Sequence, residues 1–265
     1  MRGRLALVTG GGTGLGRCIS LGLAARGYDL IINYSRSKKE ATETADECRA
    51  KGTKVTLVQA DVSEPAGCRL LADAADAQHG KLDLLVNNAG VTRQARDLAD
   101  LSLLNKDDFM DVYSVNVAGP FLALQALKPL LLNAHAQTDR ASVVLNVSSV
   151  AGLTGVGSSL AYIASKGALN SMTIALARSL GPQIRVNALC PGFIGTRWFR
   201  DAMSEDKYAA TVANVQARTA LHVASGPDDI ADVALFLCGD ESRHVTGELI
   251  RVDGGMHLGE ASLKK

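Results

Sequence analysis

The sequence predicts an α/β fold, in which one doubly wound parallel sheet of about seven strands carries helices on both faces. Short apolar runs alternate with helix-length segments along the chain, which is the pattern of βαβ units with right-handed crossovers. A glycine-rich turn, residues 9–16, directly follows the first apolar run. No linker or internal repeat divides the chain, so residues 1–265 are expected to form a single domain.

The first strand is expected at residues 4–9, where the apolar run Leu5–Val8 is followed at once by glycines. An apolar run of this length suits a strand that is buried in a parallel sheet. The next segment has apolar residues at helical spacing and stops at Gly27, a favourable residue after a helix. Strand, glycine turn and helix N-terminus together suit a diphosphate, because the backbone can approach it and the unpaired N–H groups attract anions.

The later strands follow the same alternation with helix-length segments. They are expected near residues 29–33, 54–59, 82–87, 142–148, 184–190 and 248–252. Ser37 and Glu40 have the spacing of a capping box at the start of the second helix, and Pro227 marks the first turn of another. Residues 91–106 and 192–226 depart from the strict alternation.

A tyrosine and a lysine four residues apart, Tyr162 and Lys166, indicate a proton-transfer site, with Ser149 thirteen residues upstream. On a helix the two side chains are neighbours on one face. A phenol with a pKa of about 10 is a poor acid at neutral pH, and an adjacent ammonium favours the phenolate. The pattern alone also suits an exposed helical pair, so its weight comes from the motifs around it.

Polar residues and glycines follow several of the other expected strands. Asp61-Val62, Asn88-Ala89-Gly90 and Pro191-Gly192 come after apolar runs, and Asn116 lies within a long apolar segment. With TGxxxGxG, NNAG, Ser/Tyr-xxx-Lys and PG motifs in this order, the chain closely resembles the short-chain dehydrogenase/reductase family over about residues 4 to 258. The resemblance implies a Rossmann-type domain that transfers a hydride between a nicotinamide cofactor and a carbonyl or secondary alcohol.

The resemblance also implies a role for each matching residue. Tyr162 is expected to act as general acid in carbonyl reduction, while Lys166 lowers its pKa and bonds the nicotinamide ribose. Ser149 is expected to polarise the substrate oxygen, and Asn116 to hold a water that relays protons. The residues implied in cofactor binding are Gly10, Thr13, Gly14, Leu15, Gly16, Tyr34, Arg36, Asp61, Val62, Asn88, Ala89, Gly90, Tyr162, Lys166, Pro191, Gly192, Ile194 and Thr196.

The end of the second strand predicts the choice of coenzyme. An NAD-selective site needs a carboxylate there to bond the ribose 2′-OH, but Tyr34 stands where family members place Asp, and Arg36 is nearby. NADP(H) is therefore expected over NAD(H). Many NADP-using relatives also carry a basic residue inside the glycine loop; here that position is Thr13, and whether Arg17 reaches the site is open.

Residues 193–218 are expected to form a mobile substrate lid, because they start at the sheet edge that binds ligands and exceed an ordinary connection. Trp198 and Phe199 are expected to cover the substrate above Tyr162. Such a cover would favour medium-sized apolar carbonyls over free sugars, because a desolvated hydroxyl without a partner costs roughly 1–3 kcal/mol. The alternative is that Trp198 only anchors the lid.

The substrate remains open at this stage. Residues 88–93 and 252–255 suggest 3-oxoacyl-(acyl-carrier-protein) reductases, but residues 133–140 offer only one Arg and one His to an acidic carrier. A ketone, sugar or secondary-alcohol oxidoreductase is equally consistent. A non-catalytic nucleotide-sensing regulator has no need of the intact catalytic set, and a sugar-nucleotide epimerase would need a larger C-terminal domain.

Composition argues against several other classes. Lys and Arg total 28 against 27 for Asp and Glu, so the expected partners are small molecules and copies of this chain rather than nucleic acid. Five scattered cysteines without CxxC spacing suggest reduced thiols and no metal site. No membrane-length apolar stretch or secretory segment is evident, so a cytoplasmic protein is expected. Apolar helices over 106–135 and 161–180 predict a homo-oligomer, and the resemblance implies a homotetramer.

Overall fold

The computed structural model describes residues 3–95, 97–197 and 203–259, and these contain one sheet of seven parallel strands. The strands are β1 (Leu5–Val8), β2 (Asp29–Tyr34), β3 (Val55–Gln59), β4 (Leu84–Asn87), β5 (Ser142–Val147), β6 (Ile184–Pro191) and β7 (Leu249–Val252). Their order across the sheet is β3-β2-β1-β4-β5-β6-β7. The chain changes direction across the sheet between β1 and β4, which is where doubly wound folds bind ligands.

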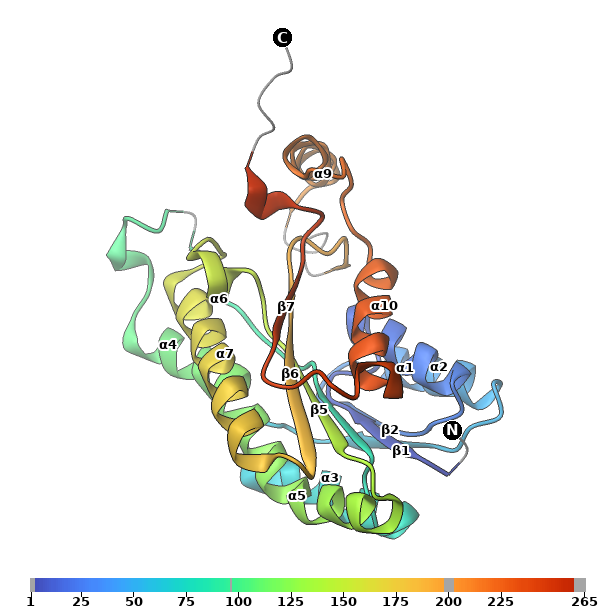
Figure 1. Cartoon of the computed structure of the whole chain (residues 1–265). Helices are drawn as coiled ribbons and strands as arrows, with labels where there is room; N and C mark the ends of the chain where they lie inside the picture. Colours follow the sequence, from blue (N-terminus) through green and yellow to red (C-terminus); the bar gives the residue numbers. More distant parts are fainter. Residues whose placement is uncertain (1–2, 96, 198–202, 260–265) are drawn as a thin grey trace.

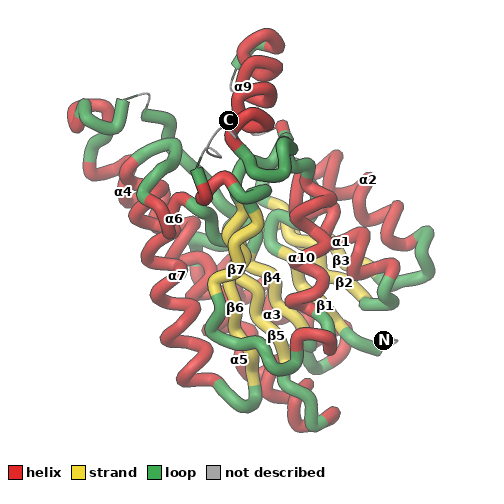
Figure 2. Tube along the Cα trace, turned by 45° about the horizontal axis from the view of Figure 1, so that its top comes forward, coloured by secondary structure: helices red, strands yellow, loops and turns green. Residues whose placement is uncertain are grey.

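Helices cover both faces of the sheet, so the predicted fold class is confirmed (Figure 1, Figure 2). On one face lie α1 (Gly14–Ala25), α2 (Lys38–Arg49) and α10 (Pro227–Cys238); on the other lie α3 (Pro65–His79), α5 (Gly119–Thr138) and α7 (Leu160–Leu180). The shorter helices are α4 (Lys106–Tyr113), α6 (Ala151–Thr154) and α9 (Glu205–Arg218). α4 and α6 pack beside α7, and α9 lies beyond the carboxyl ends of β6 and β7.

Alternate residues of each central strand enter two separate cores. Ala6 and Val8 of β1 belong to the cluster under α1 and α10, whereas Leu5 and Leu7 belong to the cluster under α3 and α5. All four side chains are fully buried. Because both faces of the sheet are covered, the strand is apolar throughout instead of alternating with polar residues.

Contrary to the expectation from the sequence, one helical run, Lys106–Thr138, is long and apolar enough, by length and composition, to cross a membrane. It is the core helix region of this fold, since α5 packs against α3 and β5 and 44% of the apolar window is buried. Length and composition of one such helix are weak evidence for a membrane span. Between α4 and α5 the run changes to one turn of π-helix, Ser114–Ala118.

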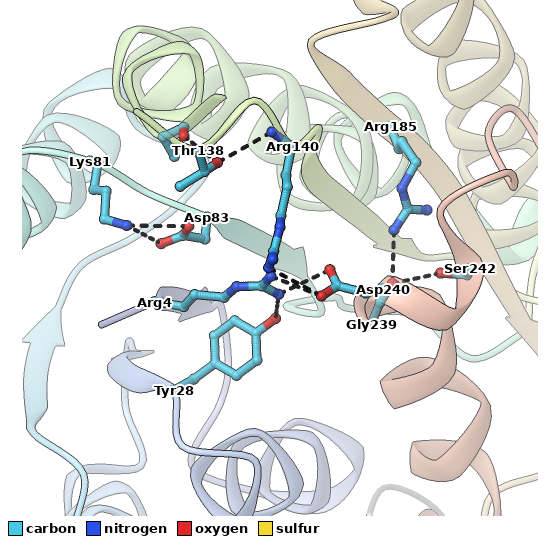
Figure 3. A network of polar contacts seen from close by, with 11 residues as sticks. Arg4, Tyr28, Lys81, Asp83, Thr138, Arg140, Arg185, Gly239, Asp240 and Ser242 are labelled. Carbon is cyan, nitrogen blue, oxygen red and sulfur yellow. Dashed lines mark hydrogen bonds and ion pairs between the residues drawn. The ribbon is translucent and has the colours of Figure 1, made fainter. Parts of the chain in front are cut away.

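An ion-pair network holds the amino edge of the sheet, at the opposite end from the predicted site (Figure 3). Arg4, directly before β1, donates to both carboxylate oxygens of Asp240 at 2.9 and 3.1 Å and to the Tyr28 hydroxyl at 3.3 Å. Arg140 lies 3.4 Å from the same carboxylate. The hydrogen bond from Arg4 is the main cause that holds the pKa of Asp240 below its usual range. The network joins the starts of β1, β2 and β5 to the segment after α10.

The segment predicted as a lid is partly helical. α9 occupies Glu205–Arg218, and its Tyr208 and Val215 side chains are buried. Trp198 and Phe199 lie outside the described residues, so their predicted position over the substrate stays a prediction. The lid motion is likewise a prediction.

The capping box predicted at the start of α2 is wrong. Ser37 is the N-cap residue, but its hydroxyl accepts no hydrogen bond from the first turn of the helix. Its oxygen instead accepts a hydrogen bond from Arg197 at 2.7 Å. Arg197 is 160 residues away in sequence, so no local pattern could indicate this competition.

Candidate active site

The glycine turn between β1 and α1 is packed too tightly for side chains at three positions, Gly11, Gly12 and Gly16. A Cβ on Gly16 would lie 2.3 Å from the carbonyl oxygen of Gly10, and one on Gly12 would lie 2.6 Å from the Ala41 Cα. Gly10 and Gly14 also have φ of +60° and +52°, a region that favours glycine. The motif is therefore required by the backbone and by its packing against α2.

The N-terminus of α1 has the features of an anion-binding site. Thr13 is the N-cap residue but makes no side-chain capping bond, and no acidic residue stands in the first turn. The first N–H groups and the positive end of the helix dipole are therefore available to an anion. A Cβ on Gly14 would touch only Thr196, at 3.5 Å. Backbone can thus approach a diphosphate closely here, and the turn fits a dinucleotide.

Thr9 is a site residue that the motif argument missed. It is 2% exposed, and its Oγ1 accepts the N–H groups of Asn88 and Ala89 at 2.9 and 3.0 Å. The Asn88 side-chain amide donates back to the carbonyls of Thr9 and Gly10 at 2.9 and 3.2 Å. The ends of β1 and β4 are therefore bonded to each other, and Asn88 and Gly90 are held beside the glycine turn. In the sequence Thr9 is visible only as the first residue of the TGxxxGxG motif, which does not reveal its partners after β4.

Asn33 plays a similar part on the other side of β1. It is 2% exposed in β2, accepts the Gly10 N–H at 3.3 Å, and donates to the carbonyls of Val58 and Ala60 at 3.3 and 2.9 Å. The glycine turn is thereby joined to the end of β3. Sequence reasoning missed Asn33 because a single Asn inside an apolar strand does not reveal its partners.

The region predicted to choose the coenzyme contains Tyr34 and Arg36 at the end of β2 and Asp61 after β3. Tyr34 is buried, whereas Arg36 is exposed. The Ser63 hydroxyl and N–H donate to Asp61 and hold the pKa of that carboxyl below its usual range, with a smaller contribution from Arg36. Val62 beside it is buried. Arg36 follows β2 and Asp61 follows β3, and these strands are neighbours, so both residues lie at the predicted adenosine end of the site.

Arg17, whose reach was open, is held by an ion pair. Its guanidinium lies 2.7 Å from the Glu47 carboxylate of α2, and both side chains are partly exposed. The hydrogen bond to Glu47 raises the pKa of Arg17. In this structure the Arg17 guanidinium is therefore paired with Glu47 of α2.

Asn116 occupies the π-helical turn and is fully buried. Its Oδ1 accepts the Val91 N–H at 2.9 Å, and its Nδ2 donates to the Val91 carbonyl at 2.9 Å and to Ser165 Oγ at 3.1 Å. The Ser165 hydroxyl donates to the Tyr162 carbonyl at 2.8 Å. Asn116 thus connects the segment after β4 with the helix that carries Tyr162 and Lys166. π-helical turns are frequent at functional sites.

α7 and the end of β5 bring the three predicted catalytic side chains together. The Ser159 hydroxyl caps α7 by accepting the Tyr162 N–H at 3.1 Å. The Ser149 Oγ accepts the Ala151 N–H at 3.1 Å after β5, and Ser149 is near enough to Tyr162 to act on its pKa. The Lys166 ammonium lies 5.7 Å from the centre of the Tyr162 ring and donates to the Val147 carbonyl at 2.9 Å.

The pKa directions differ in part from the sequence expectation. Burial raises the pKa of Tyr162, and the hydrogen bond with Ser149 opposes that rise. Burial lowers the pKa of Lys166 to about 8, while Cys190 acts in the opposite direction. The Lys166 ammonium donates to the Val147 carbonyl, and burial has the largest effect on the pKa of Tyr162. The lowering of the Tyr162 pKa by Lys166 stays a prediction.

The Pro-Gly motif ends β6 at the same edge of the sheet. The Gly192 N–H donates to the Val252 carbonyl at 2.9 Å, and a Cβ on Gly192 would lie 2.8 Å from the Asp253 Cβ. Ile194 packs against the core, and the Thr196 N–H donates to its carbonyl at 2.7 Å. On the opposite side, a Cβ on Gly90 would lie 3.7 Å from Lys166 Nζ. The predicted motifs thus meet at the carboxyl edge.

Comparison with known proteins agrees with this arrangement. Residues 10–257 match the family described as enoyl-(acyl carrier protein) reductase. The 3-oxoacyl-[acyl-carrier-protein] reductase FabG of Staphylococcus aureus is 35% identical over 256 residues, which is 96% of this chain and 98% of that protein. An oxidoreductase of Methylorubrum extorquens is 37% identical over 260 residues, covering 97% and 98%.

Solved structures extend the comparison to three dimensions. The Pseudomonas aeruginosa RhlG/NADP active-site complex is 33% identical, with a TM-score of 0.86 and coverage of 97% of each chain. Sequence and fold therefore agree along almost the entire chain, from the glycine turn to the segment after β7. This chain belongs to the short-chain dehydrogenase/reductase family and is an oxidoreductase that transfers a hydride between a nicotinamide and a carbonyl or alcohol.

Proposed function

We propose that this protein is an NADP(H)-dependent reductase of ketone carbonyls in which Asn116, Ser149, Tyr162 and Lys166 form the catalytic set. The observation that carries the proposal is the buried Lys166 ammonium, 5.7 Å from the centre of the Tyr162 ring, with Ser149 near enough to oppose the rise in the Tyr162 pKa. A single surface Tyr-x-x-x-Lys pair would have neither the serine partner nor the buried lysine.

The nicotinamide would supply the hydride in reduction and accept it in oxidation. As negative charge develops on the substrate oxygen, the Ser149 and Tyr162 hydroxyls would donate hydrogen bonds to it. Tyr162 then gives its proton to that oxygen. The Lys166 ammonium favours the resulting phenolate, because an opposite charge nearby stabilises the ionised form. Asn116 holds the Val91 segment and Ser165 in place behind these groups.

NADP(H) is the proposed coenzyme, because Tyr34 is buried and Arg36 is exposed where an NAD-selective site needs a carboxylate. One bidentate Arg–phosphate contact contributes roughly 1.5–3 kcal/mol, or about ten- to a hundred-fold in affinity. The RhlG structure, described as an NADP complex, supports this choice. The diphosphate would lie over Gly14 and Gly16 at the start of α1.

A 3-oxoacyl thioester is one proposed substrate class, since the Staphylococcus aureus relative is named as such a reductase. We further propose one domain over residues 1–265, a cytoplasmic location and a homotetramer. Phe121 of α5 and Ile174 of α7 support the oligomer, because their large apolar side chains are 47% and 42% exposed on helices that are otherwise well packed. A partner copy would cover these side chains.

The test is loss of reduced coenzyme, followed by absorbance with NADPH and NADH across ketones, β-ketoacyl thioesters and sugars. We expect turnover of at least one ketone or thioester and a higher kcat/KM with NADPH. Arg36→Ala should lower that preference about ten-fold or more. A higher kcat/KM with NADH in the wild type would overturn the coenzyme assignment. Absence of turnover across the whole panel would favour the nucleotide-sensing alternative.

A further inference from the structure

Arg197 makes a long-range contact that the proposed reaction does not use. Its guanidinium pairs with the Glu40 carboxylate through one nitrogen and donates to Ser37 Oγ at 2.7 Å through another. Arg197 follows Thr196 in the segment after β6, whereas Ser37 and Glu40 open α2 after β2. The contact therefore connects the two ends of the proposed cofactor site, which are far apart in sequence.

The neighbours of this contact place it beside the proposed 2′-phosphate position. Ser37 directly follows Arg36, the residue proposed to bind that phosphate. Thr196, directly before Arg197, lies against Gly14 of the glycine turn, 3.5 Å from where a Cβ would stand. The chain thus passes over the glycine turn at Thr196 and reaches the first turn of α2 at Arg197. A dinucleotide that runs from the glycine turn to Arg36 would pass between residues that Thr196 and Arg197 contact.

Glu40 gives the contact its electrostatic consequence. A carboxylate near the adenosine ribose favours the free 2′-OH of NAD and repels the 2′-phosphate of NADP. Glu40 lies one helical turn from Ser37, and its carboxylate is held ionised, with its pKa below the usual range, mainly by its own backbone N–H and then by Arg197. Coenzyme choice therefore depends on the Glu40 carboxylate as well as on the lack of a carboxylate at Tyr34.

The contact between Arg197 and Glu40 contributes little to the stability of the fold, so its expected effect is on the electrostatics of the coenzyme site. The Arg197 and Glu40 side chains are 46% and 40% exposed, and ion pairs between exposed side chains contribute little to stability. Such a pair can rearrange when a phosphate arrives. The guanidinium has enough N–H groups to retain one partner while it donates to a second anion.

We propose that Arg197 is a coenzyme-selectivity residue, which neutralises Glu40 and so allows the 2′-phosphate of NADP(H) to bind beside Ser37. The inference rests on the proposed coenzyme site and adds a residue from the segment after β6 to it.

The experiment measures Kd for NADPH and NADH by quenching of protein fluorescence, in the wild type, Arg197→Ala, Glu40→Gln and the double variant. Arg197→Ala should lower the ratio of NADH Kd to NADPH Kd about ten-fold, the effect of one charge-assisted contact. Glu40→Gln alone should raise the ratio, and in the double variant it should restore most of the loss. The control is Arg17→Ala, which removes another partly exposed arginine that pairs with α2, through Glu47.

The outcomes separate this inference from the proposed function. The proposed coenzyme would be contradicted by a wild type that binds NADH more tightly than NADPH, or by an Arg36→Ala variant with an unchanged ratio of NADH Kd to NADPH Kd. Neither result would contradict the Arg197 effect, because that effect is a change in the ratio on substitution of Arg197. An equal loss for both coenzymes in Arg197→Ala, no loss at all, or a loss that Glu40→Gln fails to restore would overturn the inference. An equal change of the ratio in Arg17→Ala would also overturn it, because the effect would then be a general one of surface charge.

Discussion

Thr9→Val tests whether the buried hydroxyl at the end of β1 positions the segment after β4. The substitution keeps the shape of the side chain but removes an oxygen that accepts the N–H groups of Asn88 and Ala89. The Asn88 N–H retains the Val86 carbonyl at 3.1 Å, whereas the Ala89 N–H loses its acceptor. The Ala89 N–H is partly buried, and leaving such a group without a partner costs up to about 1–3 kcal/mol.

That free energy should appear both in stability and in coenzyme binding. We expect the free energy of unfolding by urea to fall by about 1–3 kcal/mol, which leaves a folded protein because domains have roughly 5–15 kcal/mol of stability. Affinity for NADPH should fall about ten-fold, since 1.4 kcal/mol corresponds to a factor of ten and Asn88 and Gly90 lose their fixed position. Both measurements are made at one protein concentration, because oligomers gain stability with concentration.

Thr9→Ser is the matched control, because it keeps the oxygen and removes one methyl group. It should lose about 0.8 kcal/mol of stability and retain wild-type affinity for NADPH. If Thr9→Val binds NADPH as tightly as Thr9→Ser does, the hydroxyl does not position the Asn88–Gly90 segment. The argument from its hydrogen bonds would then be refuted.

Three further predictions concern chemistry, stability and assembly. Tyr162→Phe should abolish turnover but keep the wild-type Kd for NADPH, whereas Lys166→Ala should lose both; most of the wild-type rate in Tyr162→Phe would require another proton donor. Asp240→Asn should lower the thermal unfolding midpoint at neutral pH without changing kcat/KM. The pKa of Asp240 is lowered in the folded state. Its stabilisation is therefore present above the unfolded pKa of about 3.9 and disappears as pH falls through the folded value. A difference in unfolding midpoint between Asp240→Asn and the wild type that is equal at all pH values would contradict the ion-pair account. Phe121→Glu should shift the light-scattering mass from a tetramer toward smaller species, and a monomeric wild type at micromolar concentration would refute the assembly.

The sequence by itself determined the order and type of the elements. Every strand boundary lies within two residues of its expected position, because a parallel sheet covered on both faces requires apolar runs that are visible locally. The glycine turn could also be predicted from the sequence, because Gly10 and Gly14 have positive φ, a local backbone conformation that favours glycine. Tyr162 and Lys166 were found because helical spacing places them on one face.

Only the tertiary structure decided which polar groups are partners. Thr9 and Asn33 look like ordinary strand residues until β4 and β3 bring Ala89 and Ala60 to them. Ser37 had the spacing of a helix cap, but Arg197 from the far end of the chain takes its hydroxyl. These contacts join segments that are neighbours across the sheet edge and distant in sequence, so their geometry exists only after the βαβ units have packed together.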